Sequence, residues 1–556
     1  MHIRWLNEAS ESFLSKDYLL PGQTVHNRIQ VIGDAAERIL KEQCINQEDR
    51  DYLDGFSQKL QSYIARGWIS LSTPIWANFG TDRGLPISCF GSCIGDSVES
   101  ILDTVAEIGT MSKYGGGTSG YFGNVRGAGS LIKNNGISNG TPPFVELFQT
   151  TSNVMNQGSV RRGFFAAYND IFHADIERWL NFRGEGDPIQ HITWGVNVPT
   201  WWLQQMKEGD VDKRKIWARV IQKRFETGLP YIFFTDNANN GESTPECYKG
   251  KGLMKASQMC TEIMLPSDLE NSFVCDLAST NDLYYDEYKD TDCVEVVIFL
   301  LDAAMSEFVV KASKIKHLEK AVKFANEHRA LGLGRLGYHS LLQSKMIAFE
   351  SLQARNINSE IQMYLQEQSL AASVKLAEMF GECKWTEGLG RRNTTTQAIA
   401  PTTSSAFIMQ VSQSIEPWQS NYFIKDLAKG KFVIKNTYLE KLLEEKGQNT
   451  DEIWNSIKTN HGSVLHLDFL SNQEKFVFKT AKEINQEEVI IQAAQRQKYI
   501  DQGQSLNLYI SADKTAKEVN ALMLKAHDMG IKSLYYQHNS SAVGNLTKEL
   551  TCVSCE

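Results

Sequence analysis

The sequence predicts an α/β fold, because strand-like and helical stretches alternate along a chain of even composition. Strand-like runs rich in β-branched and aromatic residues occur at 230–236, 272–279, 505–511 and 532–537. Stretches with helical spacing of apolar residues occupy 1–70, 294–330, 355–380 and much of 425–500. No break in composition divides the chain, so we expect one large domain with appendages rather than separate domains.

Composition excludes several classes of protein. The 556 residues are 42% hydrophobic, which is enough for a large core, and the formal net charge is −9. A negative chain does not offer a general surface for polyanions, so no nucleic acid polymer is expected as a partner. The longest apolar stretch, 294–305, is interrupted by Glu295 and Asp302 and is too short to span a bilayer. The amino-terminal residues do not read as a secretory signal, and we expect a cytoplasmic protein.

Glycine is dense between residues 80 and 140, which predicts tight turns and a backbone that approaches a ligand closely. Farther along, Gly332, Gly334 and Gly337 form a nominal dinucleotide-binding fingerprint. They follow a stretch that looks like a polar helix, and no acidic residue lies at the required distance in a βαβ unit. We therefore interpret these glycines as tight packing of a buried helix or turn.

The chain ends in a Cys-x-x-Cys pair, Cys552 and Cys555, although termini rarely hold structural bonds. The pair could be half of a zinc site, but Cys89 and Cys93 have a different spacing and offer no matching second half. A redox dithiol is favoured, because a mobile pair can exchange with buried disulfides and meet an external reductant.

Another cysteine, Cys260, lies two residues before Glu262. If this segment is extended, the thiol and the carboxyl group point to the same side of the chain. A thiol and a carboxylate that face one pocket can pair the transfer of a hydrogen atom with the transfer of a proton. Most isolated cysteines, however, are simply packed in the core.

Several motifs occur together in a fixed order: "STPIWANFG", "SC" before "GDSVESI", "CTEIMLP", "APTTSSA", "SLYYQ" and the terminal dithiol. In this combination the chain resembles the large, catalytic subunit of class I ribonucleotide reductases over nearly its whole length. The resemblance implies a ten-stranded α/β barrel of two five-stranded halves, with a central finger loop, within residues 71–538. It also implies a helical region at 1–70 and a flexible redox-active tail at 539–556.

The resemblance implies radical-based reduction of ribonucleoside diphosphates to 2′-deoxyribonucleoside diphosphates, the step that supplies deoxyribonucleotides for DNA replication. Cys260 then becomes the thiyl radical that removes the 3′-hydrogen, and Glu262 takes the proton of the 3′-hydroxyl group. Gln258 stands where the family usually has asparagine and offers an amide to the substrate. Cys89 and Cys275 supply two electrons and end as a disulfide.

By the same resemblance, Cys552 and Cys555 reduce that disulfide and are themselves reduced again by thioredoxin or glutaredoxin. Tyr535 and Tyr536 pass the radical from a separate, metal-containing small (beta) subunit, so this chain holds no metal cofactor of its own. Neighbouring side chains in a strand face opposite ways, so stacking of the two tyrosines requires a local departure from strand geometry.

The segment "IAPTTSSAFIMQ" places hydroxyl residues before an apolar helical run, which predicts helix caps and N–H groups that can hold phosphates. The resemblance implies that the following residues bind the substrate: Thr73, Ser88, Thr402, Thr403, Ser404 and Ser405.

The family is also regulated by nucleotides that bind at a dimer interface. Asp96, Ser97 and Arg126 match the positions that bind the effector, a deoxynucleoside triphosphate or ATP, and the loop 183–195 matches the one that reads the base. A homodimer is therefore expected. Met1 leads almost directly into the helical start of the catalytic domain, so we expect specificity control without an amino-terminal ATP cone.

Two alternatives remain open at this stage. The first is a cobalamin-dependent reductase, which makes its radical without a partner subunit. The second is a non-catalytic nucleotide-binding protein whose terminal cysteines hold zinc.

Overall fold

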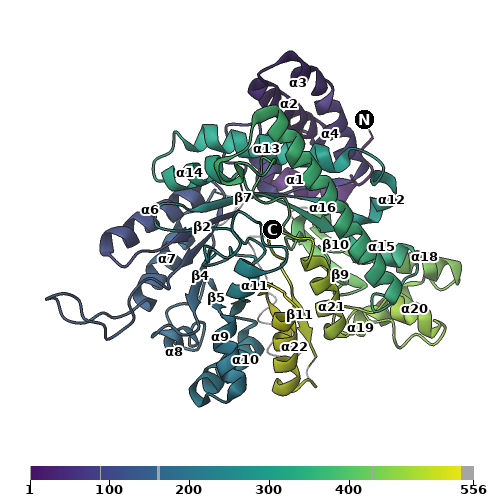
Figure 1. Ribbon diagram of the computed structural model, residues 1–556. Helices are drawn as coiled ribbons and strands as arrows, with labels where there is room; N and C mark the ends of the chain where they lie inside the picture. The colour runs from purple at the N-terminus through teal and green to yellow at the C-terminus, as the bar shows by residue number, and fades with distance from the viewer. Residues whose placement is uncertain (1, 88, 159–162, 428–429, 512, 540–556) are drawn as a thin grey trace.

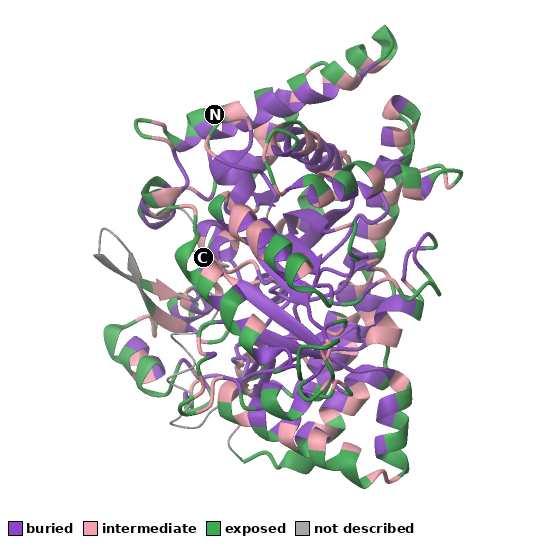
Figure 2. Ribbon diagram, turned by 90° about the vertical axis from the view of Figure 1, so that its left-hand side faces the viewer, coloured by how far each residue is buried: buried purple, intermediate pink, exposed green. Residues whose placement is uncertain are grey.

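The computed structural model describes residues 2–87, 89–158, 163–427, 430–511 and 513–539. A curled sheet stands in the middle of the molecule, and helices surround it (Figure 1). Buried residues fill the centre, and exposed residues lie on the outer faces of the helices (Figure 2). The predicted α/β class is therefore confirmed. Among the helices that the structure describes, none combines the length and apolar character needed to cross a membrane.

The amino-terminal region is helical, as its amphipathic spacing predicts. It contains α1 (Glu8–Asp17), α2 (Val25–Gln43), α3 (Gln47–Tyr52) and α4 (Phe56–Arg66). Helix α2 buries Ile29, Ile32, Ala36 and Leu40, which recur every three or four residues along one face. This face packs against α4 and against the long helix α13 (Cys293–Ala312), so the region lies outside the sheet.

Five parallel strands form the first half of the sheet, in the order β2-β3-β4-β5-β6. Their bounds are β2 (Cys89–Cys93), β3 (Gly117–Tyr121), β4 (Phe165–Asp170), β5 (Thr193–Asn197) and β6 (Tyr231–Phe233). The helices between them are α6 (Val98–Lys113), α7 (Pro142–Val154), α8 (Ile176–Trp179), α9 (Thr200–Glu208) and α10 (Val211–Thr227). These strands are buried almost throughout, as expected of parallel strands that helices cover.

The second half starts with β7 (Phe273–Asn281), which pairs in parallel with β8 (Leu331–Leu336). Parallel bridges from Leu333 to Gln397 and from Ile399 to Gln504 continue the ladder. The N–H of Leu508 then donates to the carbonyl of Tyr536 at 3.0 Å. The second half therefore also has five positions: β7, β8, residues 395–399, 503–508 and 533–537.

Two antiparallel seams join the halves. At one seam β2 pairs with β7, and at the other β6 pairs with β12 (Ser533–Leu534). Five positions from each half, joined at both edges, close a ten-stranded barrel, and the fold that the resemblance implied is confirmed. Strand β1 (Ile69–Leu71) adds to the sheet beside β7, outside this ring.

The segment 251–272, between α11 (Thr235–Asn240) and β7, runs through the inside of the barrel as a finger loop. Both halves hold it. The hydroxyl group of Tyr168 in β4 donates to the carbonyl of Gln258 at 2.7 Å. From the other half, the N–H of Gly503 donates to the carbonyl of Glu262 at 2.8 Å.

The glycine motif at 332–337 was wrongly interpreted as a helix or turn. It lies in strand β8, and Gly337, with φ of 79°, then precedes α15 (Tyr338–Ser344). The strand needs glycine here because a larger residue would not fit. A Cβ atom at Gly332 would lie only 3.2 Å from the Sγ atom of Cys275 and 2.4 Å from the side chain of Leu277. The motif serves close packing rather than a dinucleotide.

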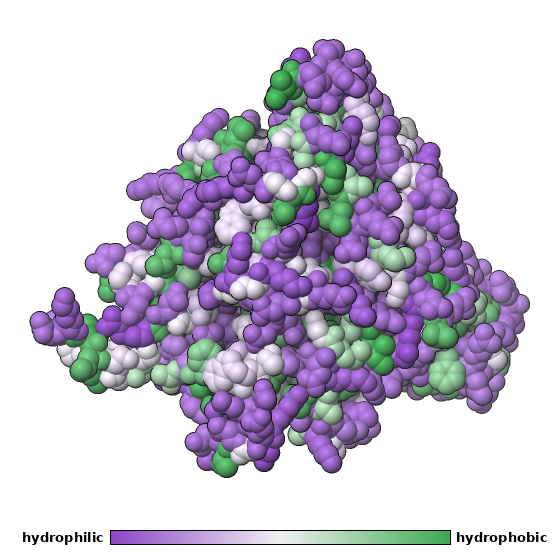
Figure 3. Space-filling view, in the orientation of Figure 1, coloured by the Kyte–Doolittle hydropathy of each residue, from purple (hydrophilic) through white to green (hydrophobic). Residues whose placement is uncertain are grey.

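The remaining elements cover the second half. They include α5 (Thr73–Asn78), α12 (Tyr285–Tyr288), α14 (Glu319–His328), α16 (Leu352–Phe380), α17 (Thr403–Met409), α18 (Thr437–Glu445), α19 (Asp451–Thr459), α20 (Asn472–Val477), α21 (Gln486–Gln497), β11 (Leu508–Ile510), α22 (Ala516–Asp528) and β13 (Gln537–Asn539). The stretch 425–500 is mostly helical, as predicted, but a hairpin of β9 (Tyr422–Leu427) and β10 (Gly430–Lys435) overlaps its start. Hydrophilic residues dominate the face seen in Figure 3, and hydrophobic residues form small scattered patches.

Candidate active site

One pocket brings together four segments that are far apart in the sequence: 70–74, 258–262, 277–279 and 400–405. Cys89 contributes to the same wall. The residues that the sequence analysis singled out and that line this pocket are Thr73, Cys89, Gln258, Cys260, Glu262, Thr402, Ser404 and Ser405. Eight of the predicted catalytic and substrate-binding residues therefore line one cavity, whereas Cys275 and Thr403 do not line it.

Cys89 and Cys275 are direct partners across the antiparallel seam between β2 and β7. Residues in such register have Cα atoms about 4.5–5.5 Å apart. Disulfides usually join cysteines whose Cα atoms are about 4.4–6.8 Å apart. Both residues are buried thiols, so a disulfide between them needs little movement of the backbone.

The thiol of Cys275 is fully buried. Burial, followed by the neighbouring Cys89, raises its pKa well above the usual value for cysteine. The amide of Gln502 donates to its Sγ atom at 3.5 Å, and the same side chain accepts from the N–H of Met264 in the finger at 3.0 Å. Cys275 is therefore held as a protonated thiol beside the finger.

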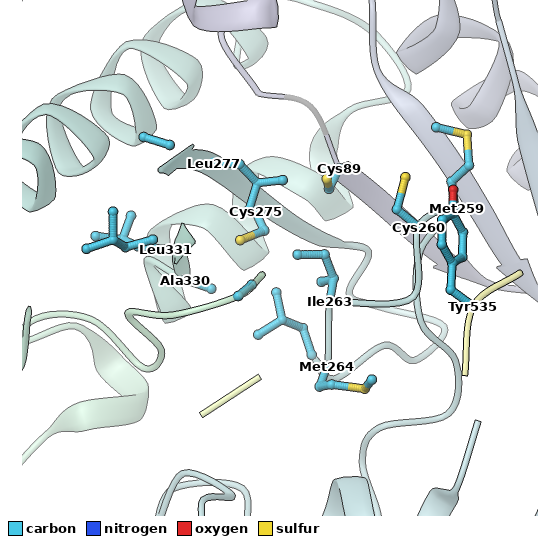
Figure 4. Packing of buried hydrophobic residues seen from close by; sticks show 14 of the residues in the cluster. Cys89, Met259, Cys260, Ile263, Met264, Cys275, Leu277, Ala330, Leu331 and Tyr535 are labelled. Carbon is cyan, nitrogen blue, oxygen red and sulfur yellow. The ribbon is translucent and has the colours of Figure 1, made fainter. Parts of the chain in front are cut away.

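The tip of the finger carries Cys260. The N–H of Cys260 donates to the side-chain oxygen of Gln258 at 2.5 Å, and the hydroxyl group of Ser505 donates to its carbonyl at 2.5 Å. In the close view, Cys89, Cys275 and Cys260 lie around this tip, with Met259 beside them (Figure 4).

The segment from Cys260 to Glu262 is not extended, so the condition under which strand alternation would place both side chains on one side is not met. Thr261 has φ of 69°, the left-handed region, which is costly for a β-branched residue. The chain turns at this point, and the turn, rather than strand alternation, brings both side chains to the same pocket. The hydroxyl group of Ser505 donates to Glu262 at 3.0 Å.

Three residues of the site were missed by sequence reasoning: Tyr168, Gln502 and Ser505. Their local sequences show only ordinary polar residues in or beside strands, and their partners in the finger are 90 to 243 positions away. Only the folded barrel reveals them. In addition, the side-chain nitrogen of Gln258 is buried, and no partner for it lies among the described residues, which leaves a donor for a ligand in the pocket.

Tyr535 and Tyr536 lie between β12 and β13, where regular strand pairing is interrupted. Their ring centroids are 4.5 Å apart, with the planes tilted by 58°. Tyr231 of β6 packs against both rings, at 4.9 and 5.1 Å. Figure 4 shows Tyr535 in the same close view as Met259 and Cys260 of the finger tip. The break in the strand thus permits two neighbouring tyrosines to contact each other.

The predicted hydroxyl caps at the phosphate segment were wrong in detail. Helix α17 begins at Thr403, but Thr402 adopts a left-handed conformation and its side chain does not cap the helix. Its oxygen instead accepts from the N–H of Ser414 at 2.7 Å, while Ser405 donates to the carbonyl of Leu71 at 3.2 Å. The side chains brace the loop, and Thr403 lines a different pocket.

The residues matched to effector binding form a separate group. Arg126 and Asp96 make an ion pair at 2.8 Å, and both side chains are more than one-third exposed. Ser97 caps α6 by accepting from the N–H of Ser100 at 3.1 Å. Within the described residues, none of the three lines the pocket that holds the cysteines. Residues 184–188, within the loop matched to base reading, border another cavity, beside α10.

Three predicted site residues, Ser88, Cys552 and Cys555, lie outside the described residues. Across the part of the chain that the structure covers, no group of three or more histidine, cysteine or acidic residues is arranged to hold a metal ion.

One protein-family model matches nearly the whole barrel of this chain. The model "Ribonucleotide reductase, barrel domain" matches residues 87–210, 202–388 and 383–537. The chain belongs to the ribonucleotide reductase family.

Relatives of this reductase chain agree with that assignment. It is 34% identical over 533 residues to the putative ribonucleoside-diphosphate reductase large subunit of Frog virus 3 (isolate Goorha), covering 90% of this chain and 92% of the relative. It is 33% identical to the large subunit of Invertebrate iridescent virus 3, with the same coverage. Among solved structures, it matches the Actinobacillus ureae class Id ribonucleotide reductase alpha subunit with a TM-score of 0.90 and 50% identity, over 98% of this chain and 99% of that one. The reductase chain is therefore a large subunit of the class I type.

Proposed function

We propose that this subunit reduces ribonucleoside diphosphates to 2′-deoxyribonucleoside diphosphates with a thiyl radical and a cysteine dithiol. The observation that carries the proposal is the register of Cys89 with Cys275 beside a pocket that Cys260 also lines. The printed names of the viral relatives, both ribonucleoside-diphosphate reductase large subunits, support the choice of substrate.

In the proposed reaction, Cys260 as a thiyl radical takes the 3′-hydrogen atom of the ribose. Glu262 takes the proton of the 3′-hydroxyl group, and the 2′-oxygen leaves as water. Cys89 and Cys275 provide two electrons and two protons and form a disulfide, after which Cys260 returns the hydrogen atom. In the net reaction, one ribonucleoside diphosphate and one dithiol give one 2′-deoxyribonucleoside diphosphate, one water molecule and one disulfide.

The buried surroundings suit this chemistry. Cys260 and Glu262 are 5% and 1% exposed, so bulk water is kept from a reactive radical. Ser505 orients the carboxylate, and Gln258 directs a buried donor group to the substrate. The loop Thr402–Ser405 holds the diphosphate through its backbone N–H groups, with the hydroxyl groups of Ser404 and Thr73 beside it in the pocket.

A one-electron oxidant on the metal-containing small subunit supplies the radical, which reaches Cys260 through Tyr536 and Tyr535. The terminal pair Cys552 and Cys555 reduces the internal disulfide and is renewed by thioredoxin or glutaredoxin. Nucleotide effectors bind near Asp96, Ser97 and Arg126 at the interface of a homodimer.

The direct test is formation of deoxycytidine diphosphate from cytidine diphosphate with an effector, a dithiol reductant and the cognate small subunit. Product is expected only when the small subunit is present. Product formed with adenosylcobalamin alone, or full activity of Tyr535→Phe, would contradict the proposal and favour the cobalamin-dependent alternative. Absence of any product, with tightly bound zinc in the purified chain, would favour the non-catalytic alternative.

A further inference from the structure

A second pocket lies where the tyrosine pair leads into the last described strand. Its wall includes Tyr509 of β11, His538 and Asn539 of β13, and Trp418. Tyr536 does not line this pocket and is only 7% exposed. Anything that oxidises Tyr536 from this side therefore meets other aromatic side chains first.

Strand register creates a row of aromatic rings between this pocket and the tyrosine pair. Because β11 and β13 are parallel, Tyr509 is the direct partner of His538. Their rings stack with centroids 4.8 Å apart and planes inclined by 13°. The ring of His538 in turn lies 6.1 Å from that of Tyr536. Tyr509, His538, Tyr536 and Tyr535 thus form one continuous series of contacts.

The phenol of Tyr509 has a dedicated proton acceptor. Its hydroxyl group donates to Oε2 of Glu416 at 2.7 Å, and it accepts from the amide of Gln419 at 3.0 Å. Asn507 donates to the other oxygen of Glu416 at 2.5 Å. Burial raises the pKa of Glu416 to about 7, so near neutral pH this carboxyl group both accepts and returns protons readily.

Besides Tyr509, the wall of this pocket carries two oxidisable rings: Tyr422, which packs against Trp454, and Trp418. Its indole nitrogen is buried, and no hydrogen-bond partner for it lies among the described residues. Loss of an electron from a buried ring is favoured when its proton has an acceptor, because an unpaired buried charge is costly. Tyr509 meets this condition, and Trp418 does not.

We propose that Tyr509 is a third tyrosine of the radical route, placed before Tyr536, and that Glu416 is its proton acceptor. The inference rests on the proposed function, in which a radical arrives from the small subunit. The oxidant takes one electron from Tyr509, and the phenolic proton moves to Glu416. Tyr509 then regains one electron and one proton from Tyr536, the next tyrosine of the row, and Glu416 keeps its proton until the radical returns.

The test uses the complete complex of both subunits with cytidine diphosphate and effector. The probe is 3-aminotyrosine, which is nearly the size of tyrosine and is oxidised more easily, placed at position 509 or, separately, at position 536. Electron paramagnetic resonance should detect an aminotyrosyl radical at either position. Tyr509→Phe should lower turnover at least about 100-fold, whereas Tyr288→Phe, a control at another buried tyrosine, should lower it less than about threefold.

Glu416→Gln keeps an oxygen for the hydrogen bond but cannot take the proton. It should lower the yield of radical at position 509 by about tenfold, whereas Glu107→Gln, a control at another buried carboxyl group, should not. A radical at position 536 but none at 509, together with an active Tyr509→Phe variant, would overturn the inference and leave the proposed function intact. No radical at either position and no turnover by the unaltered complex would instead overturn the proposed function, and the inference with it.

Discussion

The proposed catalytic pocket and the proposed effector region are held together in opposite ways. At the pocket, Cys89 lines the wall and is fixed by strand register opposite the buried Cys275, and the finger tip is tied to both halves of the barrel. In the effector region, Asp96 and Arg126 are partly exposed and bind each other. The first arrangement is preorganised for one reaction, whereas the second is an ion pair that a charged ligand can exchange at little cost, because exposed pairs contribute only about 0–1 kcal/mol.

This contrast predicts that substitutions in the pocket abolish chemistry, while substitutions in the effector region change only its control. The largest effect is expected for Cys260→Ser, because the hydroxyl group of serine does not form the radical that sulfur forms. Turnover should fall at least about 10³-fold in an assay of deoxycytidine diphosphate. Cys247→Ser, a control at another buried cysteine, should retain activity within about threefold, and equal losses in the two variants would contradict the account.

A smaller loss should follow from Ser505→Ala, which removes the hydrogen bond to Glu262 and the one to the carbonyl of Cys260. A hydrogen bond to a charged group contributes about 1.5–3 kcal/mol, so kcat should fall by about 10- to 100-fold. The steady-state rate with saturating substrate measures this effect. Ser511→Ala, at a serine near the end of β11, is the matched control and should retain the full rate.

In the effector region, Arg126→Ala should weaken the binding of the effector by about 5- to 50-fold, corresponding to about 1–2 kcal/mol. The rate at saturating effector should stay within about twofold, since Arg126 does not line the catalytic pocket. Equilibrium binding of a labelled nucleotide measures the affinity for the effector, and the effector dependence of turnover measures the rate at saturating effector. The control variant Lys133→Ala removes an exposed cation of the neighbouring loop and should leave the effector affinity and the rate unchanged. A large loss of kcat in Arg126→Ala would contradict the proposed separation of the two regions.

The last prediction concerns stability rather than activity and comes from Glu107, a buried residue of α6, the helix that Ser97 caps. Burial raises its pKa from 4.5 to about 7. The folded state therefore binds this proton more tightly than the unfolded state, and stability is lost as pH rises from about 4.5 through 7. Between pH 5 and 8 the loss is about 2–3 kcal/mol.

Glu107→Gln should remove this part of the pH dependence. Urea denaturation at pH 5 and pH 8 measures the free energy of unfolding. Between these pH values, the free energy of unfolding should fall by about 2–3 kcal/mol more in the unaltered chain than in the variant. Identical losses would show that Glu107 is not held in its protonated form.

The sequence predicts several strands of ordinary strand composition, although it misses the hairpin of β9 and β10, and it also misses strands that are rich in glycine and serine. The segments around β6 and β7 are rich in aromatic and β-branched residues and were recognised. The segments "CFGSC", "GTSGY" and "LGLGRL" became β2, β3 and β8, although glycine and serine are weak strand formers. Their small residues are tolerated because close packing inside the barrel needs space, as at Gly332.

The site shows the same division. Residues within compact motifs, such as Cys260 and Glu262, could be singled out from the sequence, and the structure places them in one pocket. Ser505 and Gln502 could not, because their roles arise only when the second half of the barrel meets the finger. The left-handed turn at Thr261 was also hidden, since nothing in a threonine signals a positive φ.

The central claim is that Cys89 and Cys275 deliver the electrons of each reduction. It is tested most directly by one turnover without external reductant, in a chain whose terminal cysteines are replaced (Cys552→Ser and Cys555→Ser). After mixing with the small subunit, effector and cytidine diphosphate, peptide mass spectrometry should find one disulfide, between Cys89 and Cys275, for each deoxycytidine diphosphate formed. Product formed while both cysteines remain thiols, or a disulfide that instead involves Cys93, would contradict the account.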